Sequence, residues 1–190
     1  MVVTLCTRLN DEPRQALAWI AESFGKLPKP KRQLPVLYTL DPAQDGERSV
    51  TLRRVGGAPM IYAMYHIPPG AHPDYAAVEM LDLLLTDTPS GRLHRALVDG
   101  KLAAGVFGFA QALADPGFAV YGAQLGAGQD VRQAQEVLLA TIESFAKTPV
   151  TREELQRARA KWLKDWDMTF SDPERVGIAL SEAIAAGDWR

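Results

Sequence analysis

The chain has 190 residues, of which 47% are apolar and 23% are charged, and its formal net charge is -2. This length suits one domain, or one domain with part of another, and the apolar content allows a substantial core. The near-neutral charge argues against a nucleic-acid-binding protein, which usually carries a clustered basic excess. No apolar run approaches the ~20 residues that cross a bilayer, so we expect neither nucleic acid nor a membrane as a partner.

The first residues predict a strand followed by a helix. Val2–Cys6 is a short β-branched run, and its Cys6 is the chain's single cysteine, which excludes an internal disulfide and a zinc ribbon. We interpret Cys6 as a small buried apolar residue of that strand. Asn10 or Asp11 can cap a helix that carries apolar residues at helical spacing as far as Phe24.

A proline-rich, basic stretch follows. Lys26 to Pro35 contains three prolines and four basic residues, which predicts an extended linker, with a basic recognition motif as the alternative. Arg48–Val55 alternates in polarity, and Met60–Ile67 is a second apolar run after a Gly-Gly-Ala-Pro turn. We therefore expect these two runs to form a β-hairpin.

The rest of the chain predicts five helices and one more hairpin. In chain order, the helices open at His72–Asp74, Ser90, Val131, Thr151 and Asp172, and the two strands are Ala103–Ala110 and Phe118–Leu125. Thr151 and Glu154 have the spacing of a capping box. The stripe expected to be buried on the long helix that follows comprises Leu155, Ala158, Trp162 and Trp166. Hairpins and helices in separate runs predict an α+β fold, with helices packed on one face of an antiparallel sheet.

No arrangement typical of a zinc peptidase is present. The chain has three histidines, and the motif H-x-x-E-H needs two of them four residues apart so that one helix face presents both to the metal. Four residues after His66, His72 and His94 stand Gly70, Ala76 and Val98. We therefore assign no catalytic and no metal-binding residue, and the substrate-binding residues are unknown at this point.

Other catalytic patterns are also missing. No serine lies in a G-x-S-x-G elbow, and neither Gly-Lys pair is followed by Ser or Thr as a phosphate-binding loop requires. Gly126-Ala127-Gly128 follows an expected hairpin strand, so we interpret it as a simple turn. An independent small-molecule enzyme would need a polar pocket that these patterns do not indicate.

Several segments, in order, resemble the pitrilysin/insulinase-type zinc peptidase family, which includes mitochondrial processing peptidase. The matching segments are Phe24–Pro28 for F-G-x-[IL]-P, His72–Asp74 for H-P-D, Ser90–Leu93 with Leu97–Val98 for S-G-R-L-[YF]-x-x-L-[VR]-E, Ala114–Gly117 for a turn, and Thr151–Leu155 for T-x-E-E-L. The resemblance covers essentially the whole chain, and it matches the segment that follows the zinc-binding region of the family.

The resemblance implies a role as one half of a clamshell. In this family a first half binds zinc and activates water, and a second half encloses the peptide and can contribute Arg and Tyr from a pattern like R-E-x-x-G-L-A-Y. Here Leu97 stands at the arginine position and Ala104 at the tyrosine position. Neither side chain can donate a hydrogen bond to an oxyanion. The resemblance thus implies no cofactor in this chain, with zinc in the catalytic half of the parent protein.

The resemblance also divides the chain. Residues 1–25 would be the closing strand and helix of the preceding half-domain, 26–35 a linker, and 36–190 a non-catalytic half-domain truncated at its C-terminus. The expected partners are a catalytic half-domain and a peptide substrate, with a homodimer left open. The leading hypothesis is the non-catalytic half of a bacterial zinc endopeptidase, and the alternative is an interaction module of a wholly inactive relative. The compartment is open between periplasm and cytoplasm, and the resemblance slightly favours the periplasm.

Overall fold

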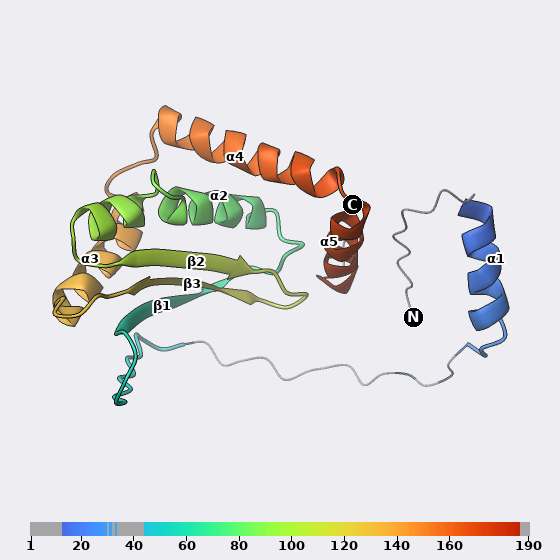
Figure 1. The fold of residues 1–190 in the computed structure, drawn as a ribbon, viewed down its shortest axis with the longest axis horizontal. Helices are drawn as coiled ribbons and strands as arrows, with labels where there is room; N and C mark the ends of the chain where they lie inside the picture. Colours follow the sequence, from blue (N-terminus) through green and yellow to red (C-terminus); the bar gives the residue numbers. More distant parts are fainter. Residues whose placement is uncertain (1–12, 30, 32, 34–43, 187–190) are drawn as a thin grey trace. The chain divides into compact units, whose positions relative to one another are not determined.

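A computed structural model describes residues 13–29, 31, 33 and 44–186 (Figure 1). The described residues up to Val55 and those from Gly56 onward belong to two separate compact units. The first unit contains α1, Pro13–Phe24, which confirms the predicted helix. This helix ends at Gly25, whose N–H donates to the carbonyl of Ala21 at 2.8 Å. The predicted strand Val2–Cys6 and most of the predicted linker lie outside the described residues.

Helix α1 leaves apolar side chains exposed. Ala16 is buried, but Leu17 is 62% exposed, Trp19 49% and Phe24 47%. The apolar side of α1 is therefore poorly covered among the described residues. Since burying one large apolar side chain contributes roughly 1.5–3 kcal/mol, these exposed side chains leave α1 with little stabilisation from packing.

The larger unit is built on a three-stranded antiparallel sheet. Its strands are β1 (Met60–Ile67), β2 (Gly105–Gln111) and β3 (Gly117–Gln124), in the spatial order β1-β3-β2. Strands β2 and β3 form the hairpin predicted from the sequence, joined through a turn before Gly117. The central strand β3 pairs along its whole length with β1, and Ala63 lies opposite Tyr121.

The predicted hairpin of Arg48–Val55 with β1 is wrong in this structure. Residues 48–55 form no strand, and all of them are exposed. The partner of β1 is β3, which is more than fifty positions further along the chain. An alternating pattern gives a segment the capacity to form a strand, but a strand also needs a neighbour to accept and donate its backbone hydrogen bonds.

The helices occur where the sequence predicted them. They are α2 (Tyr75–Thr86), α3 (Val131–Glu143), α4 (Arg152–Phe170) and α5 (Pro173–Ala186), with a short 3-10 turn η2 (Ser144–Ala146). The capping box of α4 is formed, because Thr151 Oγ1 accepts from the N–H of Glu154 and the Glu154 carboxylate accepts from the N–H of Thr151. The short helix expected from Ser90 is a π-helix, η1, at His94–Asp99.

The helices cover one face of the sheet in successive layers. Helix α2 packs on β2, α4 lies across α2, and α3 packs on β1 (Figure 1). The core combines alternate residues of β1 and β3 with the facing helix residues, among them Ile61, Ala63, Tyr121, Leu85, Leu97 and Leu138. This arrangement confirms the predicted α+β fold with helices on one side of an antiparallel sheet.

The expected buried stripe of α4 is largely wrong. Ala158 is buried at 7% exposure, but Leu155 is 48% exposed and Trp166 is 47% exposed. Trp162 is half-buried, and its indole N–H donates to Glu79 Oε2 at 3.0 Å. The physical reason is that α4 packs against α2 and not against the sheet, so only a narrow line of its residues is covered. None of the described helices is long and apolar enough to span a membrane.

Candidate functional site

The stretch from Leu97 to Ala104 is the one that the family resemblance connects with catalysis. Lys101, within it, has a φ of 60° and is the non-glycine residue with positive φ among the described residues. L-residues adopt this left-handed conformation at a cost, whereas glycine adopts it freely. The pattern R-E-x-x-G-L-A-Y has its glycine at this position. The backbone therefore supports the register that places Leu97 and Ala104 at the arginine and tyrosine positions.

Hydrogen bonds hold Lys101 in this conformation. Its N–H donates to the Val98 carbonyl at 2.9 Å, and its own carbonyl accepts from Gln129 Nε2 at 2.8 Å. The Oε1 atom of the same glutamine accepts from the N–H of Gly126 at 2.6 Å. Gln129 thus joins the end of η1 to the turn that leads into α3.

Leu97 and Ala104 offer no catalytic group. Leu97 is fully buried at 0% exposure within the hydrophobic core, and its carbonyl accepts from the N–H groups of Leu102 and Ala103. Ala104 is exposed where β2 begins, and its N–H donates to the Gln124 carbonyl at 2.8 Å. Neither side chain can donate to a developing oxyanion.

The three histidines lie in separate places. His66 is exposed on β1 opposite Phe118. His72 Nδ1 accepts from the N–H of Asp74 at 3.1 Å, and His94 Nδ1 lies 3.7 Å from Asp99 Oδ1. Within the part of the chain that the structure describes, no three His, Cys, Asp or Glu side chains form a group able to hold a metal. That the chain binds no zinc stays a prediction.

The face of the sheet opposite the helices is open and apolar. Met60 is 46% exposed, Tyr62 58% and Met64 68% on β1, and Phe109 is 47% exposed on β2. The buried residues of β1 alternate with these exposed ones, and Ile61, Ala63 and Ile67 belong to the core. The apolar side chains on this face therefore point away from the helical layer.

Cross-strand pairing arranges this face in rows. Tyr62, Gly122 and Phe107 share one row, and Met64, Val120 and Phe109 share the next. In the first row the Tyr62 and Phe107 rings meet edge to face, with centroids 5.4 Å apart. A Cβ at Gly122 would lie 2.5 Å from Phe107 Cζ, so glycine is required for the aromatic ring to lie over the central strand. We call the exposed Met60, Tyr62, Met64 and Phe109, the half-buried Phe107 and Phe118, and the buried Val120 between them the open sheet face.

The open sheet face carries no charged group. The remaining positions in the same rows are His66, Gln111, Gln124, Gly105 and Gly122, so no Asp, Glu, Lys or Arg projects from this side of the three strands. Sequence reasoning had assigned no such surface. The available signal was that the residues of β1 are apolar on both of its faces, with the exception of His66, which is unusual for a strand with one side in water.

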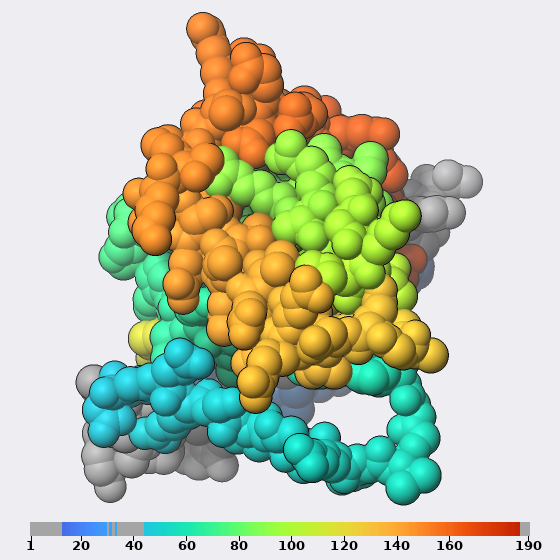
Figure 2. Space-filling view, turned by 90° about the vertical axis from the view of Figure 1, so that its left-hand side faces the viewer, coloured from blue at the N-terminus to red at the C-terminus, as the bar shows by residue number. Residues whose placement is uncertain are grey.

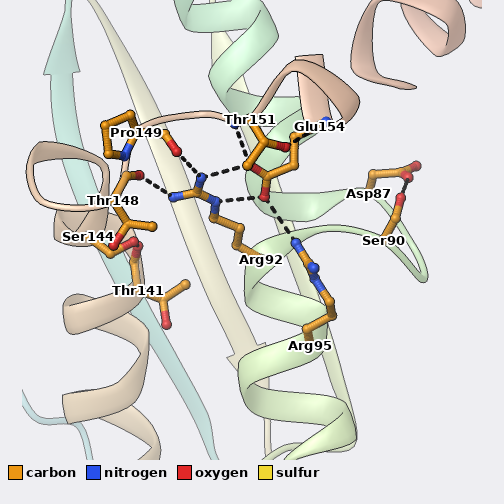
Figure 3. Close-up of polar contacts among 10 residues, drawn as sticks. All are labelled: Asp87, Ser90, Arg92, Arg95, Thr141, Ser144, Thr148, Pro149, Thr151 and Glu154. Carbon is orange, nitrogen blue, oxygen red and sulfur yellow. Dashed lines mark hydrogen bonds and ion pairs between the residues drawn. The ribbon is translucent and has the colours of Figure 1, made fainter. Parts of the chain in front are cut away.

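A second feature is a partly buried ion-pair cluster that joins Arg92, just before η1, and Arg95, within η1, to the start of α4 (Figure 3). The Arg92 guanidinium donates to Glu154 Oε1 at 3.0 Å and to Glu154 Oε2 at 2.8 Å, and also to the carbonyls of Thr148 and Pro149. The central guanidinium carbon of Arg92, Cζ, lies 4.2 Å from the centre of the Phe145 ring. Figure 2 shows the green segment that contains η1 lying against the orange segment that leads into α4.

This cluster is saturated with its own partners. Side-chain hydrogen bonds from Arg92 lower the pKa of Glu154 to about 2, against the opposing effect of burial. Arg95 adds a third contact to the carboxylate at 3.1 Å. A small hollow beside it is lined by Asp87, Ser90, Arg157 and neighbouring leucines, and Ser90 donates to Asp87. Because the carboxylate is fully bonded, the cluster acts as a structural clamp between two elements.

A third polar feature lies under α2. Burial raises the pKa of Asp82 to about 6, with a smaller contribution from the charge of Glu79. Its Oδ1 atom and the Tyr121 hydroxyl are buried without a hydrogen-bond partner among the described residues. Burial also raises the pKa of the Tyr121 phenol. These groups sit in the core of the layer and not on an open surface, so they affect stability more directly than binding.

Comparisons with known proteins agree with this architecture. Residues 1–161 match the family described as the peptidase M16 inactive domain. The chain is 27% identical over 160 residues to the zinc protease PqqE of Helicobacter pylori, which covers 83% of this chain and 36% of that protein. The chain therefore spans about a third of the length of this relative.

Two solved structures extend the comparison. The inactive peptidase domain of a candidate zinc protease from Bordetella parapertussis is 55% identical, with a TM-score of 0.67, over 74% of this chain and 77% of that one. A protease from Helicobacter pylori shares the fold at a TM-score of 0.85 and 22% identity, over 94% of this chain and 44% of that one. The chain belongs to the M16, pitrilysin-type zinc protease family, as an inactive domain.

Proposed function

We propose that this chain is the non-catalytic half-domain of a bacterial zinc endopeptidase and closes a peptide-binding chamber with a zinc-binding catalytic half. The single observation that carries the proposal is the open sheet face, which is uncharged, apolar and left bare by the helices. Contiguous exposed apolar surface of this kind marks a surface that another molecule covers.

The chemistry of the open sheet face suits both parts of this role. Its methionines adapt to different shapes, and its aromatic rings offer large contact area at a small cost in conformational entropy. Tyr62, Met64 and Phe109 could pack at the rim against the catalytic half and still leave apolar surface for a peptide. The buried Leu97 and the exposed Ala104 supply no hydrogen-bond donor, so this half would contribute enclosure and binding, with zinc and water activation in the other half.

Helix α1 supports an attachment to the catalytic half. Its Leu17, Trp19 and Phe24 side chains are about half exposed or more, and it belongs to a compact unit separate from the residues after Gly56. The proposal assigns residues 1–25 to the end of the preceding, catalytic half-domain, whose sheet or helices would cover these side chains.

A binding measurement tests the proposal. The chain is titrated against the zinc-binding half-domain from the same organism by calorimetry, as the wild type and as the variants Met64→Glu and Met168→Glu. Met64 is 68% exposed on the open sheet face, and Met168 is 47% exposed on α4, so the second variant is a matched control. We expect Met64→Glu to weaken binding at least about tenfold, because a carboxylate would be desolvated at the interface.

The outcomes are distinct. Wild-type affinity for Met168→Glu together with weakened Met64→Glu supports the proposal. An equal effect of both variants, or no association of the wild type, contradicts it.

The alternative is an interaction module of a wholly inactive relative. The specific observation in its favour is that both catalytic positions of this half, Leu97 and Ala104, lack a donor. The sequence of the parent protein distinguishes the two, since only the peptidase requires an H-x-x-E-H motif in the half that precedes this chain.

A further inference from the structure

The middle of the open sheet face is apolar, and the rows on either side of it contain polar residues. The two neighbouring rows that contain Tyr62 and Met64 consist of apolar residues, aromatic residues and glycine across all three strands. The row on one side contains Gln124, and the row on the other side contains His66 and Gln111. We call the two middle rows the apolar band.

The apolar band is accessible and its rings are held in place. Tyr62 is 58% exposed, Met64 68% and Phe109 47%. The Tyr62 hydroxyl donates to Met60 Sδ at 3.1 Å, so this polar group has a partner within the face. The Phe109 ring meets the Phe118 ring edge to face, with centroids 6.2 Å apart. A ligand would therefore meet an apolar surface that is already formed.

The size of the apolar band suits a peptide better than a folded partner. Three strands about 4.8 Å apart and two rows about 7 Å apart give the band an area on the order of 200 Å². A stable interface between folded proteins covers about 800 Å² on each partner. A folded partner would need much further surface around the band, whereas an extended peptide segment of about three residues would cover it. The exposed methionines adapt to different shapes, which also favours exchangeable ligands.

An extended peptide matches the two rows in spacing. Alternate residues of an extended chain project to the same side and lie about 7 Å apart. The Tyr62 and Met64 rows have this same spacing, because the two residues alternate along β1. A peptide that runs along the strands can therefore place the side chains of its residues i and i+2 over the two rows.

The lack of charge on the face decides which side chains fit there. No Asp, Glu, Lys or Arg projects from this side of the three strands. A charged side chain over the apolar band would lose water and gain no ion pair, which is unfavourable. An apolar side chain would instead gain roughly 25 cal/mol for each Å² of its surface removed from water.

We propose that the apolar band binds an extended peptide segment with the pattern apolar-x-apolar and discriminates against acidic and basic side chains at the two outer positions. This inference rests on the proposed function, because it assigns a class of peptide to the chamber that the two half-domains enclose. Phe107 is the central specificity-determining residue, since its ring lies over Gly122 and meets the Tyr62 ring in the middle of the face.

Hydrolysis of matched peptides tests the selectivity. The zinc-binding half-domain, with this chain in saturating excess, is given fluorogenic Ser/Gly peptides that carry Leu-Thr-Leu, Lys-Thr-Lys or Asp-Thr-Asp, and the triplet is moved along the peptide in a set. At the best placement we expect kcat/KM for the leucine peptide to be at least about tenfold above the other two.

A charge placed in the apolar band should change this preference. Phe107→Lys should lower kcat/KM for the leucine peptide and raise it for the aspartate peptide, each at least about threefold, because the ammonium can attract the carboxylate. Phe107→Met should keep the wild-type order. Tyr62→Lys repeats the test from β1 and does not depend on the folding of the Phe107 variant. Met168→Lys, 47% exposed on α4, is the matched control and should leave all three values unchanged.

Calorimetry of each variant with the zinc-binding half-domain separates the two proposals. If the variants associate and Phe107→Lys and Tyr62→Lys leave the ratio of aspartate to leucine turnover unchanged, the selectivity is overturned and the proposed function stands. The same ratio change in Met168→Lys would also overturn the selectivity, because it would not arise at the apolar band. If the wild-type chain does not associate, the proposed function fails and the selectivity fails with it.

Discussion

Arg92 and Glu154, which lie 62 positions apart, form a bidentate ion pair with N–O distances of 3.0 and 2.8 Å. The side chains are only 10% and 11% exposed. Arg92 comes from the S-G-R-L segment and Glu154 from the T-x-E-E-L segment, which were two of the motifs behind the family resemblance. In this chain the two segments therefore meet in space: the first supplies the donor, and the second supplies the acceptor and the cap of α4.

Removal of Arg92 should therefore be costly. Arg92→Ala leaves a partly buried carboxylate without its main partner, and we expect a loss of about 1.5–3 kcal/mol in the free energy of unfolding. Arg95→Ala is the matched control, because Arg95 is 51% exposed and makes a single contact at 3.1 Å with the same carboxylate. Its loss should stay below about 1 kcal/mol. Urea denaturation of both variants checks this, and equal losses would contradict the clamp.

Asp82 should make the protein less stable as the pH rises from about 4 to about 6. Its pKa is raised from 3.8 to about 6 in the fold, so the folded state holds a proton that the unfolded state has released in this range. Stability is therefore highest below the unfolded pKa and is lost as the pH rises through the folded one.

Asp82→Asn tests this pH dependence. The variant should remove the decline between pH 4 and 6 and be more stable than the wild type at pH 7.5 in urea denaturation. Glu154 does not confuse the readout, because its lowered pKa contributes stability that is lost only as the pH falls below about 4.5 toward 2. An unchanged slope in Asp82→Asn would show that this carboxyl does not titrate as described.

Lys101→Gly should stabilise the fold. The positive φ of Lys101 costs about 1 kcal/mol for a residue with a Cβ, and glycine avoids that cost while its N–H and carbonyl keep their hydrogen bonds. We expect a gain of about 0.5–1 kcal/mol in chemical denaturation. Lys101→Ala keeps the Cβ and is the control, which should show no gain. A loss in the glycine variant would indicate that the lysine side chain itself matters.

The two tryptophans of α4 should differ in their contribution. Trp162 is half-buried and donates to Glu79, so Trp162→Ala should cost about 1–3 kcal/mol, which is less than a fully buried aromatic would. Trp166 is 47% exposed and stacks on Trp162 with centroids 5.3 Å apart. Trp166→Ala should cost less than about 1 kcal/mol. Thermal unfolding of both variants measures the two stability losses. A larger loss for Trp166→Ala than for Trp162→Ala would contradict the layered packing of α4 on α2.

Local signals predicted most elements. The capping box at Thr151 and the turn before Gly117 are contained within a few residues, and they fixed the start of α4 and the β2–β3 hairpin from sequence alone. The predictions that were wrong depend on which segments pack or pair with each other in space. Arg48–Val55 has a strand pattern, but whether it pairs depends on a neighbour that periodicity cannot identify.

The spacing of apolar residues along a helix also does not show how much of that helix a neighbouring layer covers. Ala158 and Trp166 lie on the same stripe of α4, yet only Ala158 is buried, because coverage depends on where α2 lies beneath the helix. The open sheet face was missed for a related reason. Met60, Tyr62 and Met64 were interpreted as part of an apolar strand, and only the pairing with β2 and β3 shows that they join Phe107 and Phe109 in one exposed surface.

The most direct test of the central claim is hydrolysis of a fluorogenic peptide by this chain, by the zinc-binding half-domain and by their equimolar mixture, with zinc measured in each after dialysis. The account predicts no turnover and no stoichiometric zinc for this chain alone, and faster turnover by the mixture than by the zinc-binding half. One tightly held zinc per chain with turnover by this chain alone would contradict it, and so would a mixture no more active than the zinc-binding half by itself.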